Sequence, residues 1–331
     1  MKRIKIAQIG TSRYSHGFSA WRSLLKQSDI FDVVGYALPE GEREKFSDLM
    51  HRFDGGREMT VEEILSDPEI EAVAVETEEI YLTKYALMVA KAGKHLYMEK
   101  PGSPNIADFE ALVNILKEKK LAFGLGYMYR FNPKIKEVLE KVKRGDLGKI
   151  YSVEAQMNCK HDAVCRAWLE NFPGGMLFFL GCHLIDLIYQ IQGEPSEVIP
   201  LSCSTGIEGV NTQDFGMAVY KYPNGVSFAK TCDDELGGVM RRQLVITGEL
   251  GTVEIRPLEA SCVGGQYTGY RDCFDSSWGA NGEEGRTEPY DRYDDMLRNF
   301  AEMVRGKENP YDYDYELRLF KLIMRSCGIN E

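Results

Sequence analysis

The sequence predicts a two-domain α/β protein, with a doubly wound parallel sheet in residues 1–128 and an α+β domain in residues 129–331. The length of 331 residues suggests about two domains of roughly 150 residues each. In the first stretch, short apolar strands alternate with longer helices, which is typical of a parallel sheet. In the second stretch, strand-like runs follow one another across tight turns, which indicates a mostly antiparallel sheet.

The first domain begins with an alternating and then apolar run that ends at Gly10, as a buried first strand does. Phe18, Trp21 and Leu24 follow at helical spacing, and the alternation of strand and helix then continues to residue 128. The expected strands are Lys2–Ile9, Phe31–Ala37, Ala72–Val75, His95–Met98 and Leu121–Gly126, and the expected helices are Ser15–Ser28, Glu40–Phe53, Thr60–Leu65, Tyr81–Ala92 and Asn105–Lys119.

The second domain contains a hairpin signal, Asn224-Gly225, and a second expected turn at Gly248–Gly251. Gly264–Pro289 is rich in glycine and polar residues, which predicts a long and mobile loop. The expected helices are Pro133–Arg144, Met176–Gln192, Tyr293–Arg305 and Tyr315–Cys327, and the expected strands are Ile150–Met157, Val198–Cys203, Phe215–Tyr220, Val226–Thr231, Gln243–Thr247 and Thr252–Ile255.

The composition excludes several classes of protein. Fifty-one acidic against 40 basic residues give a net charge of −11, which argues against a general nucleic-acid binder. No apolar run approaches the roughly 18 residues of a membrane span, so we expect a cytoplasmic protein with no membrane partner. The eight cysteines form neither a Cys-x-x-Cys pair nor a zinc spacing, so we expect reduced thiols and no metal site.

The most informative stretch is Lys94–Pro104, in which the apolar run His95–Met98 ends in Glu99, Lys100 and Pro101. Ligands of open α/β sheets bind outside the carboxyl ends of the strands, so a lysine at this point can face a substrate. The alternative is a solvated Glu–Lys pair in a strand-to-helix loop.

Four segments favour the ligand site, because together they resemble the oxidoreductase family that includes inositol dehydrogenases and glucose–fructose oxidoreductases (the Gfo/Idh/MocA family). They occur in the family's order and spacing, and the resemblance covers nearly the whole chain. It implies a Rossmann domain followed by an α+β domain whose sheet mediates oligomer contacts. The segments are AGKHLYMEKP (92–101), GYMYRFNP (126–133), GDLGKI (145–150) and the glycine pair Gly174-Gly175 followed by GCHLID (181–186).

The resemblance also implies roles for individual residues. Lys100 matches the lysine that hydrogen-bonds the reacting hydroxyl beside the nicotinamide, and His183 matches the histidine that exchanges the hydroxyl proton. An imidazole suits proton transfer near neutral pH. Asp186, one helical turn after His183, lies on the same face and is expected to bind a second hydroxyl. Arg130 and Asn132 match a segment that lines the site, with structural helix entry as the alternative. A buried structural histidine is the alternative for His183.

The sequence departs from the family pattern on the substrate side. Phe179 stands where the family usually has a carboxylate, four residues before the histidine, and it can neither orient an imidazole nor bind a hydroxyl. Either the substrate differs or the activity is weak or lost. His161 and Asp162 are candidate replacements, with a solvated loop as the alternative. Trp168 matches the tryptophan of a Trp-Arg pair, but Leu169 replaces the arginine.

The residues on the cofactor side also depart from the family pattern. In the expected Gly-x-Gly-x-x-Gly, Gly10 is kept, whereas Ser12 and Ser15 replace the second and third glycines. Arg13 is expected to pair with phosphate, and the amides that start the next helix suit an anion. No acid follows the second strand, where Leu38 stands, so NAD and NADP cannot be distinguished; Glu40 and Arg43 are possible substitutes. The carboxylates Glu76, Glu78 and Glu79 near a pyrophosphate site are unfavourable unless they point away. The expected cofactor-binding residues are Gly10, Thr11, Ser12, Arg13, Thr77, Glu99, Lys100 and Trp168.

Two functions are therefore expected from different classes. The first is an NAD(P)-dependent oxidoreductase that acts on a sugar, cyclitol or related polyol as a homodimer or homotetramer. The second is a degenerate family member that binds a sugar or nucleotide as a sensor or partner without turnover. Retention of Lys100 and His183 favours the first, whereas Ser12, Leu38 and Phe179 favour the second. A cycle of oxidation, elimination and re-reduction on a tightly bound cofactor stays a third possibility.

Overall fold

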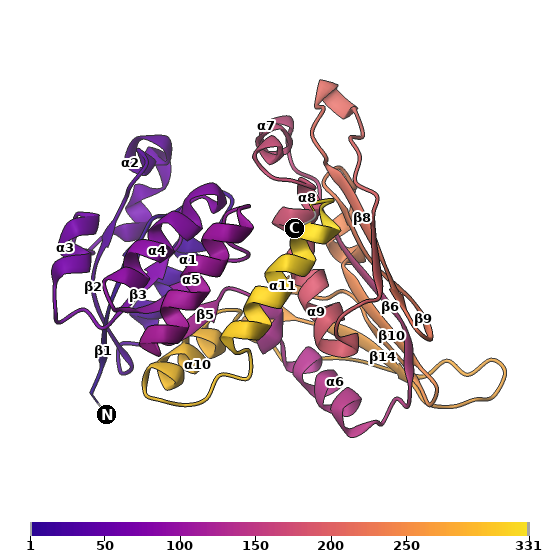
Figure 1. Ribbon diagram of the computed structural model, residues 1–331. Helices are drawn as coiled ribbons and strands as arrows, with labels where there is room; N and C mark the ends of the chain where they lie inside the picture. The colour runs from indigo at the N-terminus through magenta and orange to yellow at the C-terminus, as the bar shows by residue number, and fades with distance from the viewer. Residues whose placement is uncertain (1, 330–331) are drawn as a thin grey trace. The chain divides into compact units, whose positions relative to one another are not determined.

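The computed structural model of the protein describes residues 2–329 (Figure 1). The chain divides into two compact units, which are described separately below. The first comprises the described residues up to Tyr127 together with Tyr293–Phe320. The second comprises Met128–Arg292 and the described residues from Lys321 onward.

The first unit is built on a parallel sheet of five strands in the order β2-β1-β3-β4-β5. Strands β3 and β4 are buried at nearly every position, as expected for strands covered on both faces. The order reverses direction between β1 and β3, which is where open α/β sheets bind ligands. The strands are β1 (Ile4–Ile9), β2 (Phe31–Ala37), β3 (Ala72–Val75), β4 (His95–Met98) and β5 (Phe123–Leu125).

Local sequence explains where the helices of this unit begin. Thr60 and Glu63 form a reciprocal capping box at the start of α3, and the Asn105 side chain accepts a hydrogen bond from the Asp108 amide at the start of α5. The helices are α1 (Gly17–Lys26), α2 (Glu42–Lys45), α3 (Val61–Ser66), α4 (Leu82–Lys91) and α5 (Ile106–Lys119), with 3₁₀ turns η1 (Ser47–Phe53) and η2 (Glu79–Tyr81).

Two helices expected from the sequence are shorter than predicted. The helix expected over Glu40–Phe53 divides into α2 and the 3₁₀ segment η1, because Phe53 enters an aromatic cluster with Trp21 and Tyr36. The helix expected over Ser15–Ser28 begins only at Gly17.

Residues 293–320 pack with the first unit, although the division at residue 128 placed them in the second domain. In α10 (Asp294–Val304), Asp294 accepts hydrogen bonds from Ser23 and Lys26 of α1. In α11 (Tyr313–Ser326), the Phe320 ring stacks on Phe109 of α5, with centroids 4.1 Å apart. These contacts join segments far apart in sequence, which composition and periodicity do not reveal.

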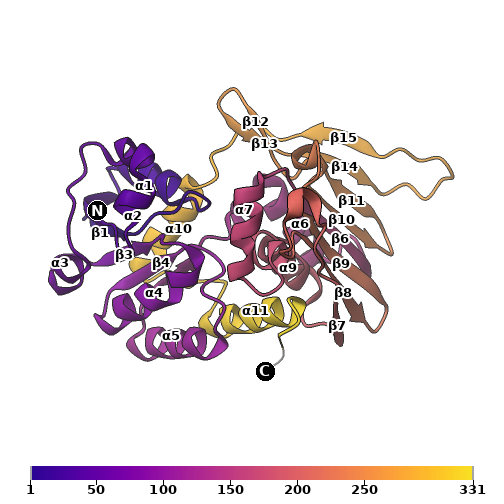
Figure 2. The ribbon, with the colours of Figure 1, turned by 90° about the horizontal axis from the view of Figure 1, so that it is seen from above.

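The second unit is built on an eight-stranded sheet in the order β15-β14-β11-β10-β6-β9-β8-β7. Figure 2 shows these strands side by side, from β15 and β14 at one end to β7 at the other. All pairs are antiparallel except β6 with β9, so the expectation of a mostly antiparallel sheet is confirmed. The strands are β6 (Ile150–Asn158), β7 (Glu197–Pro200), β8 (Phe215–Tyr222), β9 (Gly225–Cys232), β10 (Gln243–Gly248), β11 (Thr252–Ile255), β14 (Gly269–Cys273) and β15 (Glu283–Arg286).

Helices cover one face of this sheet, and α9 packs on β6 and β9. The helix expected over Met176–Gln192 is interrupted at Leu180, and the sequence analysis missed α7 altogether. The helices are α6 (Pro133–Arg144), α7 (Ala163–Trp168), α8 (Met176–Phe179) and α9 (Gly181–Gln192), with the 3₁₀ turn η3 (Met128–Phe131) before α6. No helix within the described residues 2–329 has the length and apolar character needed to cross a membrane.

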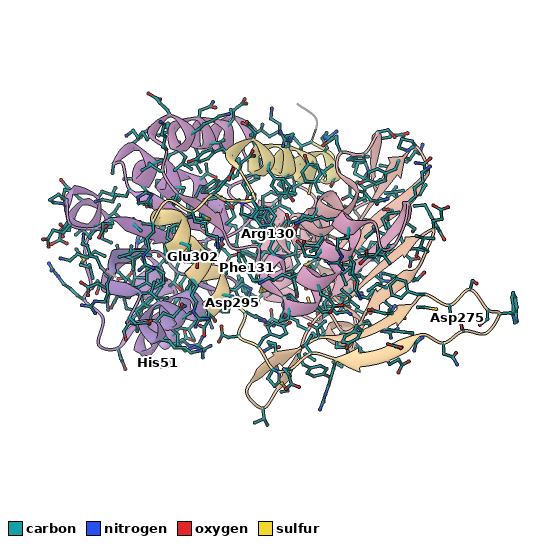
Figure 3. All side chains as sticks on the ribbon, turned by 90° about the horizontal axis from the view of Figure 1, so that it is seen from below. His51, Arg130, Phe131, Asp275, Asp295 and Glu302 are labelled. Carbon is teal, nitrogen blue, oxygen red and sulfur yellow. The ribbon has the colours of Figure 1, made fainter. Side chains whose placement is uncertain are left out.

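The prediction of a long loop over Gly264–Pro289 is wrong for much of its length. The segment contains β14, β15 and the small strand β13 (Gly265–Tyr267), which pairs with β12 (Ala260–Cys262). Several of its glycines are sites of close approach, since a Cβ on Gly269 would lie 2.5 Å from the Arg256 carbonyl oxygen. An extended tip remains between β14 and β15, and Figure 3 shows Asp275 on it.

Candidate functional site

The carboxyl ends of β1 and β3 meet at the point where the strand order of the first unit reverses. Gly10 follows β1 with φ +86°, a conformation that favours glycine. A Cβ at Gly10 would lie 2.3 Å from Cγ2 of Thr77, which follows β3. The structure therefore brings Gly10 and Thr77 together, as a site at the switch point of the sheet requires.

The loop after β1 already holds a carboxyl group of the protein. The Thr11 amide donates a hydrogen bond to Oε2 of Glu42 at 3.2 Å, and the Glu42 side chain is fully buried. Burial, together with the charges of Glu78 and Glu40, raises the pKa of Glu42 to about 9. Glu42 thus lies in the part of the loop where backbone amides suit an anion. The residue pattern indicates only Glu40 and Arg43 near this point, because the contact of Glu42 with the loop arises only in the folded structure.

Lys100 lies at the carboxyl end of β4 and is 2% exposed. Its Nζ is 3.9 Å from Oε1 of Glu99, and its backbone amide donates to the same oxygen at 3.0 Å. Burial raises the pKa of Glu99, while the charge of Lys100 acts in the opposite direction. A solvated loop pair is therefore excluded for these two residues, because both are buried at the ligand-binding edge of the sheet.

Two further carboxyl groups are buried beside this pair. Glu76 and Glu79 are fully buried, and none of their four carboxyl oxygens has a hydrogen-bond partner. Burial raises the pKa of Glu79 to about 8, and it raises that of Glu76 well above the ordinary value with help from the charges of Glu99 and Glu79. At neutral pH such groups favour the protonated form.

The remaining charged candidates of the first unit form pairs on its surface. Arg13 donates to Asp48 at 2.7 Å, and this hydrogen bond raises the pKa of Arg13 and lowers that of Asp48. Their pairing gives Arg13 a protein carboxylate in place of the expected phosphate. Glu40 accepts from Lys84 and Tyr85, Arg43 pairs with Glu58, and Glu78 pairs with Lys45.

In the second unit, Asp186 of α9 lies in a connected polar network. Asp186 accepts two hydrogen bonds from Arg130, at 3.0 Å from Nε and 2.9 Å from a terminal nitrogen, and a third from Gln190. Arg130, Asp186 and the nearby candidate His183 are all buried: Arg130 is 5% exposed, Asp186 1% and His183 1%. The His183 ring meets Tyr129 edge to face, with centroids 5.2 Å apart. The structure therefore brings Arg130 and Asp186 together as a bidentate ion pair (Figure 3 labels Arg130).

Asn132 has the structural role that the sequence left as its alternative. Its Oδ1 accepts the amides of Lys134 and Ile135 and so caps α6, while its Nδ2 donates to Leu258, Thr268 and Tyr290. Beside it, the Tyr129 hydroxyl donates to Glu259 at 2.8 Å. These contacts fix the entry to α6.

Phe179, which stands where the family has a carboxylate, belongs to an aromatic cluster. Its ring meets Trp168 edge to face at 5.2 Å between centroids, and Trp168 also packs on Phe172. Asp162 caps α7 by accepting the Cys165 amide, and His161 lies against Asp233. Neither candidate replacement therefore fills the chemical role of a carboxylate at position 179, which remains apolar.

The residue that allows close packing behind the loop is Gly17. Ser15 was expected there, but a Cβ on Gly17 would lie 3.0 Å from Thr11 Oγ1 and 3.1 Å from Glu76 Cβ. Gly17 is also the first residue of α1. A search for glycines only at the fixed spacing of the Gly-x-Gly-x-x-Gly pattern does not find Gly17.

The residues at the switch point fit a dinucleotide. Gly10 retains the tight turn, Gly17 allows the helix to approach, and the Thr11 amide already binds a carboxyl oxygen of Glu42. Glu76 and Glu79 are fully buried, and burial raises their pKa values, so at neutral pH neither carboxyl group places a negative charge beside the phosphates of a dinucleotide.

Comparison with known proteins agrees with this architecture. Residues 4–127 match the family model described as the oxidoreductase family with an NAD-binding Rossmann fold, and residues 135–254 match that of the GFO/IDH/MocA C-terminal domain. An uncharacterised oxidoreductase of Rhizobium meliloti is 23% identical over 278 residues, which cover 82% of this chain and 81% of that protein. A myo-inositol 2-dehydrogenase of Thermotoga maritima is 25% identical over 173 residues, and the match spans 51% of each chain, about half the length of that relative.

Solved structures share the fold over nearly the whole chain. A levoglucosan dehydrogenase in complex with NADH and levoglucosan superposes with a TM-score of 0.79 at 17% identity, covering 99% of this chain and 98% of that one. A 3-ketoreductase of Actinomadura kijaniata, in complex with NADP and TDP-benzene, gives 0.78 at 16% identity, covering 97% and 96%. The predicted fold class, the family and the nicotinamide class of cofactor are thereby confirmed.

Proposed function

The chain belongs to the Gfo/Idh/MocA oxidoreductase family, and from that premise we propose that it is an NAD(P)-dependent oxidoreductase of a sugar, cyclitol or related polyol. The reaction would transfer hydride between the nicotinamide and a carbon that bears a hydroxyl or keto group. Relatives with this kind of name include a myo-inositol 2-dehydrogenase and a 1,5-anhydro-D-fructose reductase.

The observation that carries the proposal is the position of Lys100. An ammonium group that is 2% exposed, at the carboxyl end of a central parallel strand, is expensive to bury unless it serves a ligand or a structural ion pair. Glu99 Oε1, 3.9 Å from the Lys100 Nζ, is its counter-ion. Perturbed carboxyl groups around such a lysine are typical of functional sites.

Each residue of the proposed mechanism acts through stated atoms. Lys100 Nζ would donate to the oxygen of the reacting hydroxyl, and a ring nitrogen of His183 would take or return its proton. Arg130 holds both carboxylate oxygens of Asp186, so we propose that the pair contacts substrate as a unit. Asn132 would shape the wall of the site through its contacts rather than bind substrate itself.

The dinucleotide would lie on Gly10, Thr11, Ser12 and Thr77, with Glu99, Lys100 and Trp168 as further contacts. When bound, the nicotinamide supplies the hydride acceptor or donor. Glu42 must then release the Thr11 amide or share it. Because burial raises the pKa of Glu42 to about 9, its carboxyl group is protonated at neutral pH; it competes for the Thr11 amide as a hydrogen-bond acceptor and adds no charge that would separate NADH from NADPH.

A second candidate is a degenerate member that binds a sugar or nucleotide without turnover. It is favoured by one specific observation, the hydrogen bond from the Thr11 amide to Glu42, which occupies an anion-binding group of the loop with the protein's own side chain. Phe179 in its aromatic cluster supports the same candidate, since no carboxylate replaces it.

We also propose that the protein forms a homodimer or homotetramer through the sheet of the second unit. Its helix-free face carries partly exposed apolar side chains on neighbouring strands, including the cross-strand pair Val219 and Phe228 and the half-exposed Val226. Such a face is usually covered by another subunit.

No disulfide joins the eight cysteines, and a reducing compartment such as the cytoplasm remains our expectation.

The test is a titration of the purified protein with NADH and with NADPH, followed by nicotinamide fluorescence and by calorimetry. We expect micromolar binding of NADH, NADPH or both, and a screen of sugars and cyclitols for turnover then follows. The Glu42→Ala variant removes the carboxyl group that occupies the Thr11 amide and should strengthen nucleotide binding, while Glu44→Ala, on the exposed side of the same helix, should leave the affinity unchanged.

If neither nucleotide binds at millimolar concentration, the oxidoreductase function is excluded and the second candidate, a family member without turnover, is favoured. Binding without turnover on any polyol would keep the nucleotide site and reject the catalytic roles of Lys100 and His183.

A further inference from the structure

A cluster of three side chains, apart from the Lys100 and Asp186 sites, forms at the ends of β6 and β9 in the second unit. Cys159 follows β6 and Asp233 follows β9, the parallel pair of this sheet. The Cys159 amide donates to the Cys232 carbonyl at 2.9 Å, and the His161 amide donates to the Asp233 carbonyl at 3.1 Å. The backbone ladder therefore continues past both strands and holds the three side chains in fixed positions.

The heteroatoms of these side chains converge on one point. Asp233 Oδ1 lies 3.0 Å from Cys159 Sγ and 2.5 Å from His161 Nδ1, and Sγ lies 3.6 Å from Nδ1. Cys159 is 4% exposed and Asp233 is fully buried. Among the described residues, no other group of three His, Cys, Asp or Glu side chains offers ligand atoms so close together.

The arrangement does not suit a nucleophilic cysteine. In such a relay, the imidazole lies between the thiol and the acid and uses a different nitrogen for each. Here Nδ1 faces both Sγ and Oδ1, so His161 cannot accept the thiol proton and donate to Asp233 through separate atoms. Convergence of all three atoms is instead the geometry of ligands around an ion.

We propose that Cys159, His161 and Asp233 bind a divalent transition-metal ion of the zinc class. Tetrahedral zinc with ordinary bond lengths separates a thiolate sulfur from an imidazole nitrogen by about 3.5 Å, and the two atoms lie 3.6 Å apart. Asp233 Oδ1 must move away from Cys159 Sγ and His161 Nδ1 by less than about 1 Å to reach the separations expected among zinc ligands. On binding, the thiol proton passes to solvent, and the thiolate and carboxylate then balance the two positive charges.

A second observation points to a ligand at the same place. Oδ2 of the fully buried Asp233 has no hydrogen-bond partner, and a metal ion would satisfy the carboxylate. Three protein ligands leave a fourth position for water or for an oxygen atom of a small ligand. The His161 side chain is 35% exposed, so that position has access to solvent. Sequence spacing does not reveal the site, because Asp233 lies far along the chain from Cys159 and His161.

The experiment uses the full-length chain, stripped with a chelator, reduced and titrated with cobalt(II) alone as a spectroscopic substitute for zinc. We expect one cobalt per chain, with a thiolate-to-cobalt charge-transfer band that zinc abolishes by competition. The band should be lost in Cys159→Ser and kept in Cys203→Ser, since Cys203 is exposed and outside the cluster. No nucleotide or substrate is present, so the outcome is independent of the proposed oxidoreductase activity.

If Cys159→Ser fails to fold, His161→Gln decides, because His161 is partly exposed and its loss should be tolerated. We expect this variant to bind cobalt at least about tenfold more weakly. Unchanged affinity in His161→Gln, a band that survives Cys159→Ser, or no saturable uptake by the unmodified protein would each overturn the proposal.

Discussion

In the first unit, Glu76 and Glu79 are buried with no hydrogen-bond partner for their carboxyl oxygens, whereas in the second unit Asp186 receives two N–H groups of Arg130 and one of Gln190. Both groups of acids are equally removed from solvent. They differ in how many hydrogen bonds the fold provides to their carboxyl oxygens.

The difference indicates what each region does without a ligand. A fully bonded ion pair holds its elements in place and contributes specificity to the fold. Unsatisfied carboxyl groups at the ligand edge of a parallel sheet cost stability, and such costs are usual at functional sites. We therefore expect mutations in the second network to damage the fold first, and mutations around Lys100 to damage function first.

The largest expected effect on stability is that of Arg130→Ala. Removing one partner of a buried ion pair leaves the Asp186 charge uncompensated, so the free energy of unfolding should fall by about 3–5 kcal/mol. Chemical denaturation followed by circular dichroism measures this change.

The control is the double variant Arg130→Met with Asp186→Leu, which replaces the pair by apolar side chains and should recover a large part of the loss. If the free energy of unfolding of Arg130→Ala falls by less than about 1 kcal/mol, the ion pair is instead exposed to solvent.

The next effect concerns function. Lys100→Ala should lower turnover by a factor on the order of 10² or more while the fold is retained, because it removes the proposed donor to the reacting hydroxyl. Steady-state kinetics with the polyol found in the screen measures it.

Lys94→Ala is the matched control for Lys100→Ala. Lys94 is also buried in the first unit, at 5% exposure, but its Nζ donates to the Asp67 and Ile70 carbonyls. This variant should lose stability and keep turnover per folded molecule. Equal losses of turnover in both variants would remove the special role of Lys100.

A smaller effect is expected in the pH dependence of stability. Folding raises the pKa of Glu42 to about 9 and that of Glu79 to about 8, from 4.5. Between these values the folded state holds more protons than the unfolded state, so the free energy of unfolding falls as pH rises from about 5 to about 8. Each group contributes a slope of at most about 1.4 kcal/mol per pH unit.

Glu79→Gln should flatten this slope, because the amide resembles the protonated acid and does not ionise. Denaturation at several pH values measures it, with Glu44→Gln as an exposed control that keeps the slope of the unmodified protein. A slope that does not change in Glu79→Gln would show that Glu79 is already ionised or solvated in the folded state.

Hydrophobic periodicity was sufficient to predict the parallel sheet, because strands that are buried on both faces appear in the sequence as continuous apolar runs such as Ala72–Val75. It failed over Gly264–Pro289, where glycines that allow strands to approach have the same composition as a flexible loop. It could not assign residues 293–320 to the first unit, since that depends on contacts such as Phe320 with Phe109.

The candidate site was predictable to the same extent. Lys100, Gly10 and Thr77 could be named because each lies within two residues of the end of a strand of the sheet. Glu42 could not, since its contact with the Thr11 amide depends on how α2 folds back over the loop. The bond between Arg130 and Asp186 likewise joins two residues that the sequence proposed separately.

The smallest effect is expected at Arg13, whose role the sequence and the structure describe differently. The sequence analysis expected its guanidinium to meet phosphate, but the structure pairs it with Asp48 at the surface. Because that pair is exposed to solvent, Arg13→Ala should change the affinity for NADH by less than about threefold. Asp48→Asn releases the arginine and should strengthen binding at low salt if the loop can use it. A loss of more than about tenfold in Arg13→Ala would mean that Arg13 leaves Asp48 for the nucleotide, and the first unit would then rearrange its charges on binding.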